Sequence, residues 1–306
     1  MPLWSEPLAR AYGACEALAR SHYENFPVAS RLLPRKMRPH VAAVYAFARV
    51  ADDIADEGSA APADRLAQLH VWQDRIHRAA AGHVAPAATV ERDELIALAL
   101  GHSIRSLDLP VSLFDDLLSA FGQDTMTTRY ASWADLFDYC RRSANPIGRL
   151  VLRIAGRRDE ALDRSSDALC TALQLTNFWQ DFGRDWRAGR LYVPRDEQRA
   201  SGADEDELRD AVSRNGPLTP AWAQTLAHAV EVTRAKFADG RAVCDGVGGR
   251  LRLELRITWL GGARILERVD HGRALLLGQR PTLGAADAPA ILWQLARWSP
   301  GQVSRG

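Results

Sequence analysis

Apolar residues recur at every third or fourth position through most of this chain of 306 residues. That spacing places them on one face of an α-helix. Alternating runs of β-branched residues, which are typical of half-buried strands, are scarce, so the pattern predicts an all-α protein. The expected helices cover residues 6–21, 36–57, 63–81, 91–105, 111–121, 132–155, 159–187, 204–213, 219–240 and 251–277. The Gly- and Pro-rich breaks between them are too short for interdomain linkers, so we expect one helical domain over residues 1–280 and a short tail over 281–306.

Charge and cysteine content exclude several classes of protein. The formal net charge of +1 gives no global field that would favour nucleic acid. The four cysteines form no CxxC pair and the histidines no HExxH pair, which favours reduced cytoplasmic thiols and no zinc site. The longest apolar stretch, residues 41–48, is far short of the ~20 residues that span a bilayer, and the first residues do not resemble a signal peptide. We expect a cytoplasmic protein that at most touches a membrane surface.

A first polar stripe crosses an otherwise apolar helix. Its members are Tyr45, Arg49, Asp52 and Asp56. Spacings of four, three and four residues put them on one face. Most other positions of this segment are apolar, and such a helix is normally buried. The stripe is therefore predicted to face a cavity, although a solvent-exposed face is the alternative for any single pair of aspartates.

A second stripe repeats the pattern between residues 168 and 185. Its members are Gln174, Asn177, Asp181 and Asp185. The spacings are three, four and four, and the neighbours again are mostly apolar. Two such stripes on apolar helices favour a shared cavity over two solvent-exposed helix faces.

Carboxylates around a cavity repel one another and lose solvation, so they need cations. Oxygen ligands without nearby His or Cys favour Mg²⁺, which leaves coordination positions open for phosphate oxygens. We expect a magnesium site that binds a diphosphate and neutralises charge as it leaves. Arg49 and Arg190 suit phosphate oxygens because a guanidinium donates two hydrogen bonds at once. Arg184 and Arg187 could equally be solvated neighbours of acidic residues.

Three stretches carry a resemblance to a known family. Residues 45–57 (YAFARVADDIADE), 177–185 (NFWQDFGRD) and 189–194 (GRLYVP) resemble the squalene/phytoene synthase family. The resemblance extends over nearly the whole chain and implies an enzyme with an isoprenoid-synthase-type helical bundle around a central cavity. It implies that Mg²⁺ joins the aspartates to a prenyl diphosphate, which Arg49 and Arg190 hold. The implied metal ligands are Asp52, Asp56, Asn177, Asp181 and Asp185.

Within the family, residues 22–30, 139–149 and 174–181 look most like the hydroxysqualene synthase (HpnC) branch of bacterial hopanoid pathways. That branch converts presqualene diphosphate and water to hydroxysqualene and diphosphate. Its partners would be the enzymes that make presqualene diphosphate and oxidise hydroxysqualene. Tyr23 and Asn25 replace an early serine pair, and residues 142–148 (RSANPIG) replace the small residues of condensing synthases. Both departures argue against condensation of two prenyl diphosphates.

The resemblance and the need to place one water suggest further site residues. Tyr139 matches a tyrosine of the family and is a candidate for proton transfer or cation stabilisation, with a buried structural role as the alternative. Asn145 is the candidate for placing the water, with Tyr45 and Tyr139 behind it; a helix-breaking cap is the alternative. The expected substrate-binding residues also include His22, Asn25 and Gln174.

Two other functions stay open at this stage. The chain could be a condensing synthase that makes presqualene diphosphate or phytoene, or a non-catalytic assembly factor of the same fold. Four intact aspartates argue against the assembly factor. Because a long hydrocarbon product barely dissolves in water, we also expect a peripheral contact with the inner membrane through Trp293 and Trp298, with core packing as the alternative.

Overall fold

The structure is a computed structural model that describes residues 4–21, 32–56, 58, 60–83 and 91–299. Every regular element in these ranges is a helix, and the β contact recorded there is an isolated parallel bridge between Arg129 and Leu191. The all-α prediction is therefore confirmed. No helix among the described residues is both long enough and apolar enough to cross a membrane. The four cysteines are free thiols.

The chain divides into two compact units. The first unit comprises residues 1–126 and 146–159, and the second comprises residues 127–145 and 160–306. The division into a domain over 1–280 and a tail over 281–306 stays a prediction, and residues 285–296 within the expected tail form helices that contact α14.

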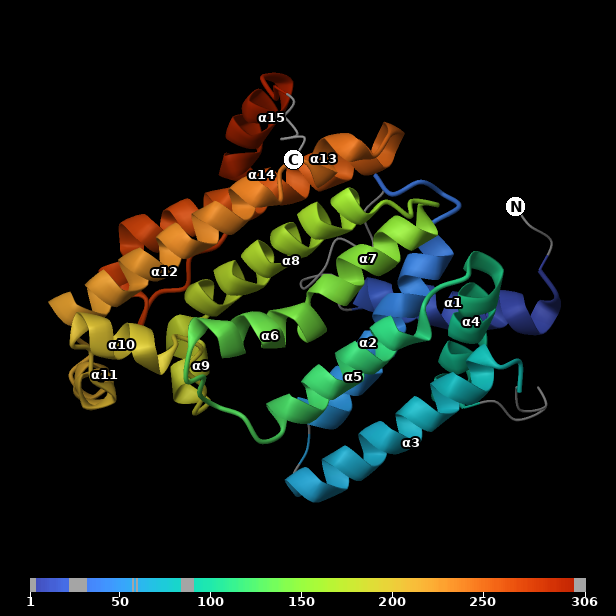
Figure 1. Cartoon of the computed structure of the whole chain (residues 1–306), viewed down its shortest axis with the longest axis horizontal. Helices are drawn as coiled ribbons and strands as arrows, with labels where there is room; N and C mark the ends of the chain where they lie inside the picture. Colours follow the sequence, from blue (N-terminus) through green and yellow to red (C-terminus); the bar gives the residue numbers. More distant parts are fainter. Residues whose placement is uncertain (1–3, 22–31, 57, 59, 84–90, 300–306) are drawn as a thin grey trace. The chain divides into compact units, whose positions relative to one another are not determined.

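The first unit is built from α1 (Glu6–Ser21), α2 (Arg38–Asp56), α3 (Pro62–Ala80), α4 (Arg92–Leu107), α5 (Val111–Asp124) and most of α7 (Asn145–Ile154). α2 contacts each of α1, α3, α4 and α5, which are coloured from blue to green in Figure 1. Nine of its residues are buried, among them Phe47. Phe47 stacks against Trp72 of α3 and meets Phe114 of α5 edge-on. Because the apolar residues of α2 are buried against these helices, its polar residues are confined to the remaining face.

The second unit is built around α8 (Glu160–Gln180), α12 (Pro220–Asp239) and α14 (Gly249–Gly272), which contact one another and run side by side in Figure 1. The remaining elements are α6 (Trp133–Ser143), α9 (Phe182–Arg187), α10 (Arg195–Ser201), α11 (Glu205–Ser213), α13 (Val243–Gly246), η2 (Arg273–Leu275), η3 (Ala285–Asp287) and α15 (Ala288–Ala296). Trp179 and Trp222 are fully buried. The indole of Trp179 donates to the hydroxyl of Thr233 at 2.8 Å, which satisfies its polar atom inside the core.

Two of the expected helices are interrupted in the structure. The segment 132–155 divides into α6 and α7 at Ala144, two residues before Pro146, which has no N–H to continue the helical ladder. The segment 159–187 divides at Asp181, between α8 and α9. The short helices α10 and α13 were not predicted, because seven and four residues are too few to show a helical period.

Candidate active site

The first stripe lies on α2 as predicted. Arg49 donates to Oδ2 of Asp52 at 3.0 Å, and its other terminal nitrogen lies 2.5 Å from Oδ1 of Asp53. Burial of the helix raises the pKa of Tyr45, which is half-buried one turn before Arg49. Asp56 ends the helix and is exposed. The stripe therefore presents an arginine that is already paired with carboxylates, and Asp53 is a member that the spacing argument missed.

The second stripe runs across the junction of α8 and α9. The N–H of Asp181 donates to the carbonyl of Asn177 at 2.8 Å, and the carbonyl of Asp181 accepts from the N–H groups of Arg184 and Asp185, both at 2.8 Å. These helical hydrogen bonds continue across the junction, so the four stripe residues stay on one face of the α8–α9 segment. Asn177 is exposed, whereas Gln174, Asp181 and Asp185 are half-buried.

The electrostatics of this junction fit a bound cation. Burial and the nearby carboxylate of Asp181 together raise the pKa of Asp185 to about 7, although the positive charges of Arg190, Arg184 and Arg280 oppose this shift. Two carboxylates in such a setting are stabilised by a cation between them. Among the described residues, no three His, Cys, Asp or Glu side chains gather into a cage. A carboxylate pair suits Mg²⁺, which usually takes one or two carboxylates together with substrate phosphates.

A braced loop holds Arg190 beside this pair. The N–H of Arg190 donates to the carbonyl of Asp185 at 2.8 Å, and Gly189 before it has φ +83°. Arg129 donates to both carboxylate oxygens of Glu205 at 2.8 and 2.9 Å and to the carbonyl of Gly189 at 2.7 Å. Arg129 therefore ties the loop to α11. Nothing in the local sequence pattern indicated this role, because the partners are 60 and 76 residues apart.

Tyr139 lies within a cluster of aromatic rings. It is 4% exposed, and its ring centroid lies 5.5 Å from that of Tyr130, 6.2 Å from Phe178 and 6.4 Å from Tyr192. Phe178 and Tyr192 stack face to face at 3.7 Å. Phe178 follows Asn177 directly in the second stripe. The structure thus brings Tyr139 to the helix that carries this stripe. The faces of aromatic rings can attract a cation, so cation stabilisation by this cluster stays a prediction.

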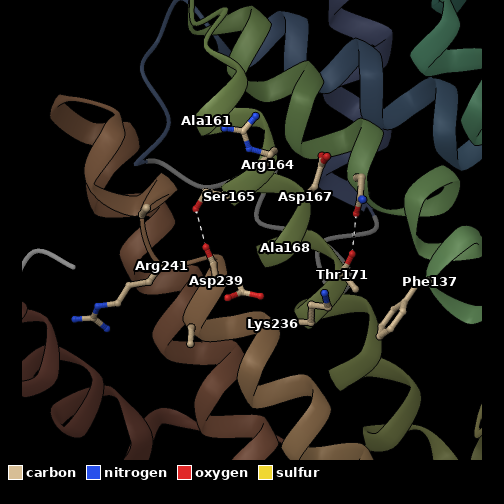
Figure 2. A pocket seen from close by; sticks show the side chains of 13 residues that line it. Phe137, Ala161, Arg164, Ser165, Asp167, Ala168, Thr171, Lys236, Asp239 and Arg241 are labelled. Atoms are coloured by element: carbon tan, nitrogen blue, oxygen red, sulfur yellow. Dashed lines mark hydrogen bonds between the residues drawn. The ribbon is translucent and has the colours of Figure 1, made fainter. Parts of the chain in front are cut away.

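Asn145 lies elsewhere in the second unit. It is 8% exposed, and its side-chain oxygen accepts a hydrogen bond from Thr171 at 3.0 Å. It lines a cavity of about 760 Å³ between α8 and the end of α12, together with Lys236 and Asp239. Figure 2 shows Lys236, Asp239 and Thr171 around this cavity. None of the described residues of the second stripe lines it, so the role of Asn145 in placing water stays a prediction.

The remaining predicted site residues divide into two groups. His22 and Asn25 lie outside the described residues. Arg184 and Arg187 are exposed residues of α9. A residue that the sequence argument missed altogether is Arg280, whose guanidinium binds the carboxylate of Asp181 from a segment 99 residues away.

The fold and the two aspartate stripes define the class of protein. The family model of squalene/phytoene synthase matches residues 19–287, and the chain belongs to this family. The bundle is the isoprenoid-synthase-type helical fold. A solved dehydrosqualene synthase, 19% identical, superimposes with a TM-score of 0.79 over 95% of this chain and 98% of that one, which supports the fold alone.

Other relatives share more of their sequence with this chain, at 33–43% identity. The hydroxysqualene synthase of Zymomonas mobilis is 43% identical over 187 residues, which are 60% of this chain and 59% of that protein. The hydroxysqualene synthase of Rhodopseudomonas palustris is 33% identical over 81% of this chain and 80% of that protein. The crystal structure of squalene synthase HpnC from Alicyclobacillus acidocaldarius is 39% identical, with a TM-score of 0.77 over 88% of this chain and 96% of that chain. The phytoene synthase of Mycobacterium tuberculosis is 33% identical over 62% of this chain and 59% of that protein.

Proposed function

We propose that this enzyme is a hydroxysqualene synthase that converts presqualene diphosphate and water to hydroxysqualene and diphosphate. The observation that carries the proposal is the carboxylate pair Asp181 and Asp185, half-buried with Arg190 beside it. The similarity to named hydroxysqualene synthases supports the choice of substrate. A cytoplasmic location is part of the same proposal.

The reaction breaks the C–O bond to diphosphate, and the electron pair of that bond leaves with the diphosphate oxygen. The cyclopropylcarbinyl cation that remains rearranges, and its ring opens. The oxygen of water then bonds to the rearranged carbocation, and one water proton is released. When bound, Mg²⁺ supplies positive charge that stabilises the departing diphosphate. The residues that would hold it are Asp52, Asp56, Asn177, Asp181 and Asp185.

The chain's own residues have three tasks in this scheme. Arg49 and Arg190 would bind diphosphate oxygens, and the loop bracing by Arg129 keeps Arg190 in position for that. The ring cluster around Tyr139 would stabilise the carbocation and shield it from water until its rearrangement is complete. Of the two roles expected for Tyr139, this is cation stabilisation. Gln174, half-buried one turn before Asn177, would contact the substrate.

A condensing synthase remains the second candidate, because a phytoene synthase also matches the chain. One experiment separates the two. Purified enzyme is incubated with presqualene diphosphate and Mg²⁺ in the absence of NADPH, and the extracted lipid is analysed by mass spectrometry. Hydroxysqualene that appears with released diphosphate, and disappears with EDTA, supports our proposal. Consumption of farnesyl or geranylgeranyl diphosphate instead would move the enzyme to the condensing branch.

A peripheral contact with the inner membrane belongs to the proposal for a hydrocarbon product. Trp293 on α15 is 61% exposed, and α15 has no buried residue. Trp298, in contrast, is half-buried, and its indole donates to Asp245 at 3.1 Å beneath the guanidinium of Arg241. Of the two expected tryptophans, Trp293 is therefore the one available to a lipid surface. Co-sedimentation of the enzyme and its Trp293→Ala variant with anionic vesicles tests this contact, and equal binding of both would contradict it.

A further inference from the structure

The guanidinium of Arg280 holds both oxygens of the Asp181 carboxylate. Its Nε donates to Oδ1, and Nη2 donates to Oδ2 at 3.3 Å. The side chain of Asp181 is 22% exposed, and that of Arg280 is 49% exposed. The forked contact takes up a lone pair on each oxygen, and the positive guanidinium repels a second cation at the same carboxylate. Because Mg²⁺ binds through carboxylate oxygens, Arg280 and a divalent cation compete for Asp181.

The segment that carries Arg280 is anchored on both sides of it. A Cβ atom at Gly183 of α9 would lie 2.5 Å from the carbonyl oxygen of Leu276, so glycine lets the backbone of this segment lie directly against the helix. On the other side, the side-chain amide of Gln180 donates to the carbonyl of Pro281 at 2.6 Å. Pro281 also restricts the backbone of the residue before it. Arg280 is thus delivered to Asp181 by a fixed backbone.

In the first unit, too, an arginine pairs with the first aspartate of a stripe, but there it comes from the same helix. There Arg49 pairs with Asp52, the first aspartate of its stripe, from the preceding turn of the same helix. In the second unit, the first aspartate receives its arginine from a distant segment. The first aspartate of each stripe is therefore already paired with an arginine.

We propose that Arg280 is the resident counter-ion of Asp181, and that a divalent cation binds Asp181 only by displacing it. This inference rests on the magnesium site of the proposed function and adds a regulatory property to it. Competition by Arg280 lowers the affinity of the site for a cation alone. By linkage, an anion that pairs with the released guanidinium raises the affinity for the cation. The site is thereby biased to load the cation and an anionic substrate together.

Manganese binding without substrate tests the competition. Free Mn²⁺ is measured by electron paramagnetic resonance during titration of the full chain, of Arg280→Gln and of Arg184→Gln. Arg184 is the matched control, because it is exposed and also places a positive charge near Asp185. We expect Arg280→Gln to bind Mn²⁺ about two- to fivefold more tightly than Arg184→Gln does, the effect of removing a partly exposed ion pair. Equal affinities in the two variants, or weaker binding by Arg280→Gln, would overturn the inference.

The displacement itself is measured in the unmodified chain. The Nε–H resonance of Arg280, assigned by its loss in Arg280→Gln, is followed in ¹H–¹⁵N spectra while Mg²⁺ is added. We expect this resonance to shift with the same Mg²⁺ dependence as binding. A resonance that stays unchanged at saturation would overturn the inference about Arg280 and leave the proposed magnesium site standing. If neither the full chain nor the variants bind any divalent cation, the magnesium site of the proposed function fails as well.

Discussion

The hydroxyl of Tyr12 lies 2.8 Å from Nδ1 of His102 and joins α1 to α4 inside the first unit. The same hydroxyl lies 3.2 Å from Nδ1 of His40 on α2 and 2.8 Å from the hydroxyl of Ser103. Burial raises the pKa of Tyr12 to about 12. Burial, with a contribution from His102, lowers the pKa of His40 to about 4. The network joins three helices, and burial favours the neutral form of both of its histidines.

The first prediction is that acid destabilises the first unit through His40. The ordinary pKa of a histidine is 6.5, so between pH 6.5 and 4 the unfolded state binds more protons than the folded state. The free energy of unfolding should therefore fall as the pH is lowered through this window. We expect His40→Asn to flatten that slope in urea unfolding, whereas His70→Asn, which changes an exposed histidine of α3, should leave it unchanged. Equal slopes in the enzyme and His40→Asn would contradict this role.

The second prediction concerns the brace on the Arg190 loop. Arg129→Gln removes the forked contact with Glu205 and the bond to Gly189. We expect a loss of about 1–3 kcal/mol in the free energy of unfolding, because the bonds are charged and partly buried. We also expect weaker binding of inorganic diphosphate in calorimetry, since Arg190 is no longer positioned. Glu205→Gln is the matched control, because it breaks the ion pair and leaves the bond to Gly189. The idea fails if both variants bind diphosphate equally.

The third prediction separates the two roles of Tyr139. Tyr139→Phe keeps the ring within 5.5–6.4 Å of its aromatic neighbours and removes only the hydroxyl. If the ring stabilises a cation, kcat should fall by less than about tenfold, whereas loss of a proton-transfer group costs about a hundredfold or more. Tyr130→Phe in the same cluster is the control for loss of a neighbouring hydroxyl. A hundredfold decrease confined to Tyr139→Phe would assign proton transfer to its hydroxyl.

The fourth prediction concerns Gly183. In Gly183→Ala the new methyl group would lie 2.5 Å from the carbonyl oxygen of Leu276 and 2.7 Å from the carbonyl carbon of Leu277. Relief of such a clash requires a backbone shift, so we expect a loss of about 1–3 kcal/mol in the free energy of unfolding. Gly248→Ala is the control, because a Cβ atom there meets nothing within 4 Å. Thermal unfolding of both variants measures the difference, and an unchanged midpoint for Gly183→Ala would show that the segment is not closely packed.

The helices were largely readable from the sequence because their signal is local. The segment 6–21 was predicted with the bounds that α1 has, and the segment 219–240 differs from α12 by one residue at each end. The interruption at Asp181 was not readable. It occurs where the backbone of residues 276–277 lies against α9, a contact that no periodicity within residues 159–187 encodes.

The sequence by itself determined the helical class and the two carboxylate stripes, because each depends on spacing within a few turns. It also carried the family resemblance, through the matching stretches 45–57, 177–185 and 189–194. Tertiary structure alone decided which side chains complete the second stripe. Arg280 reaches Asp181 across 99 residues, and Arg129 reaches Gly189 across 60. Such pairs depend on how helices pack against one another, and a one-dimensional pattern does not specify that packing.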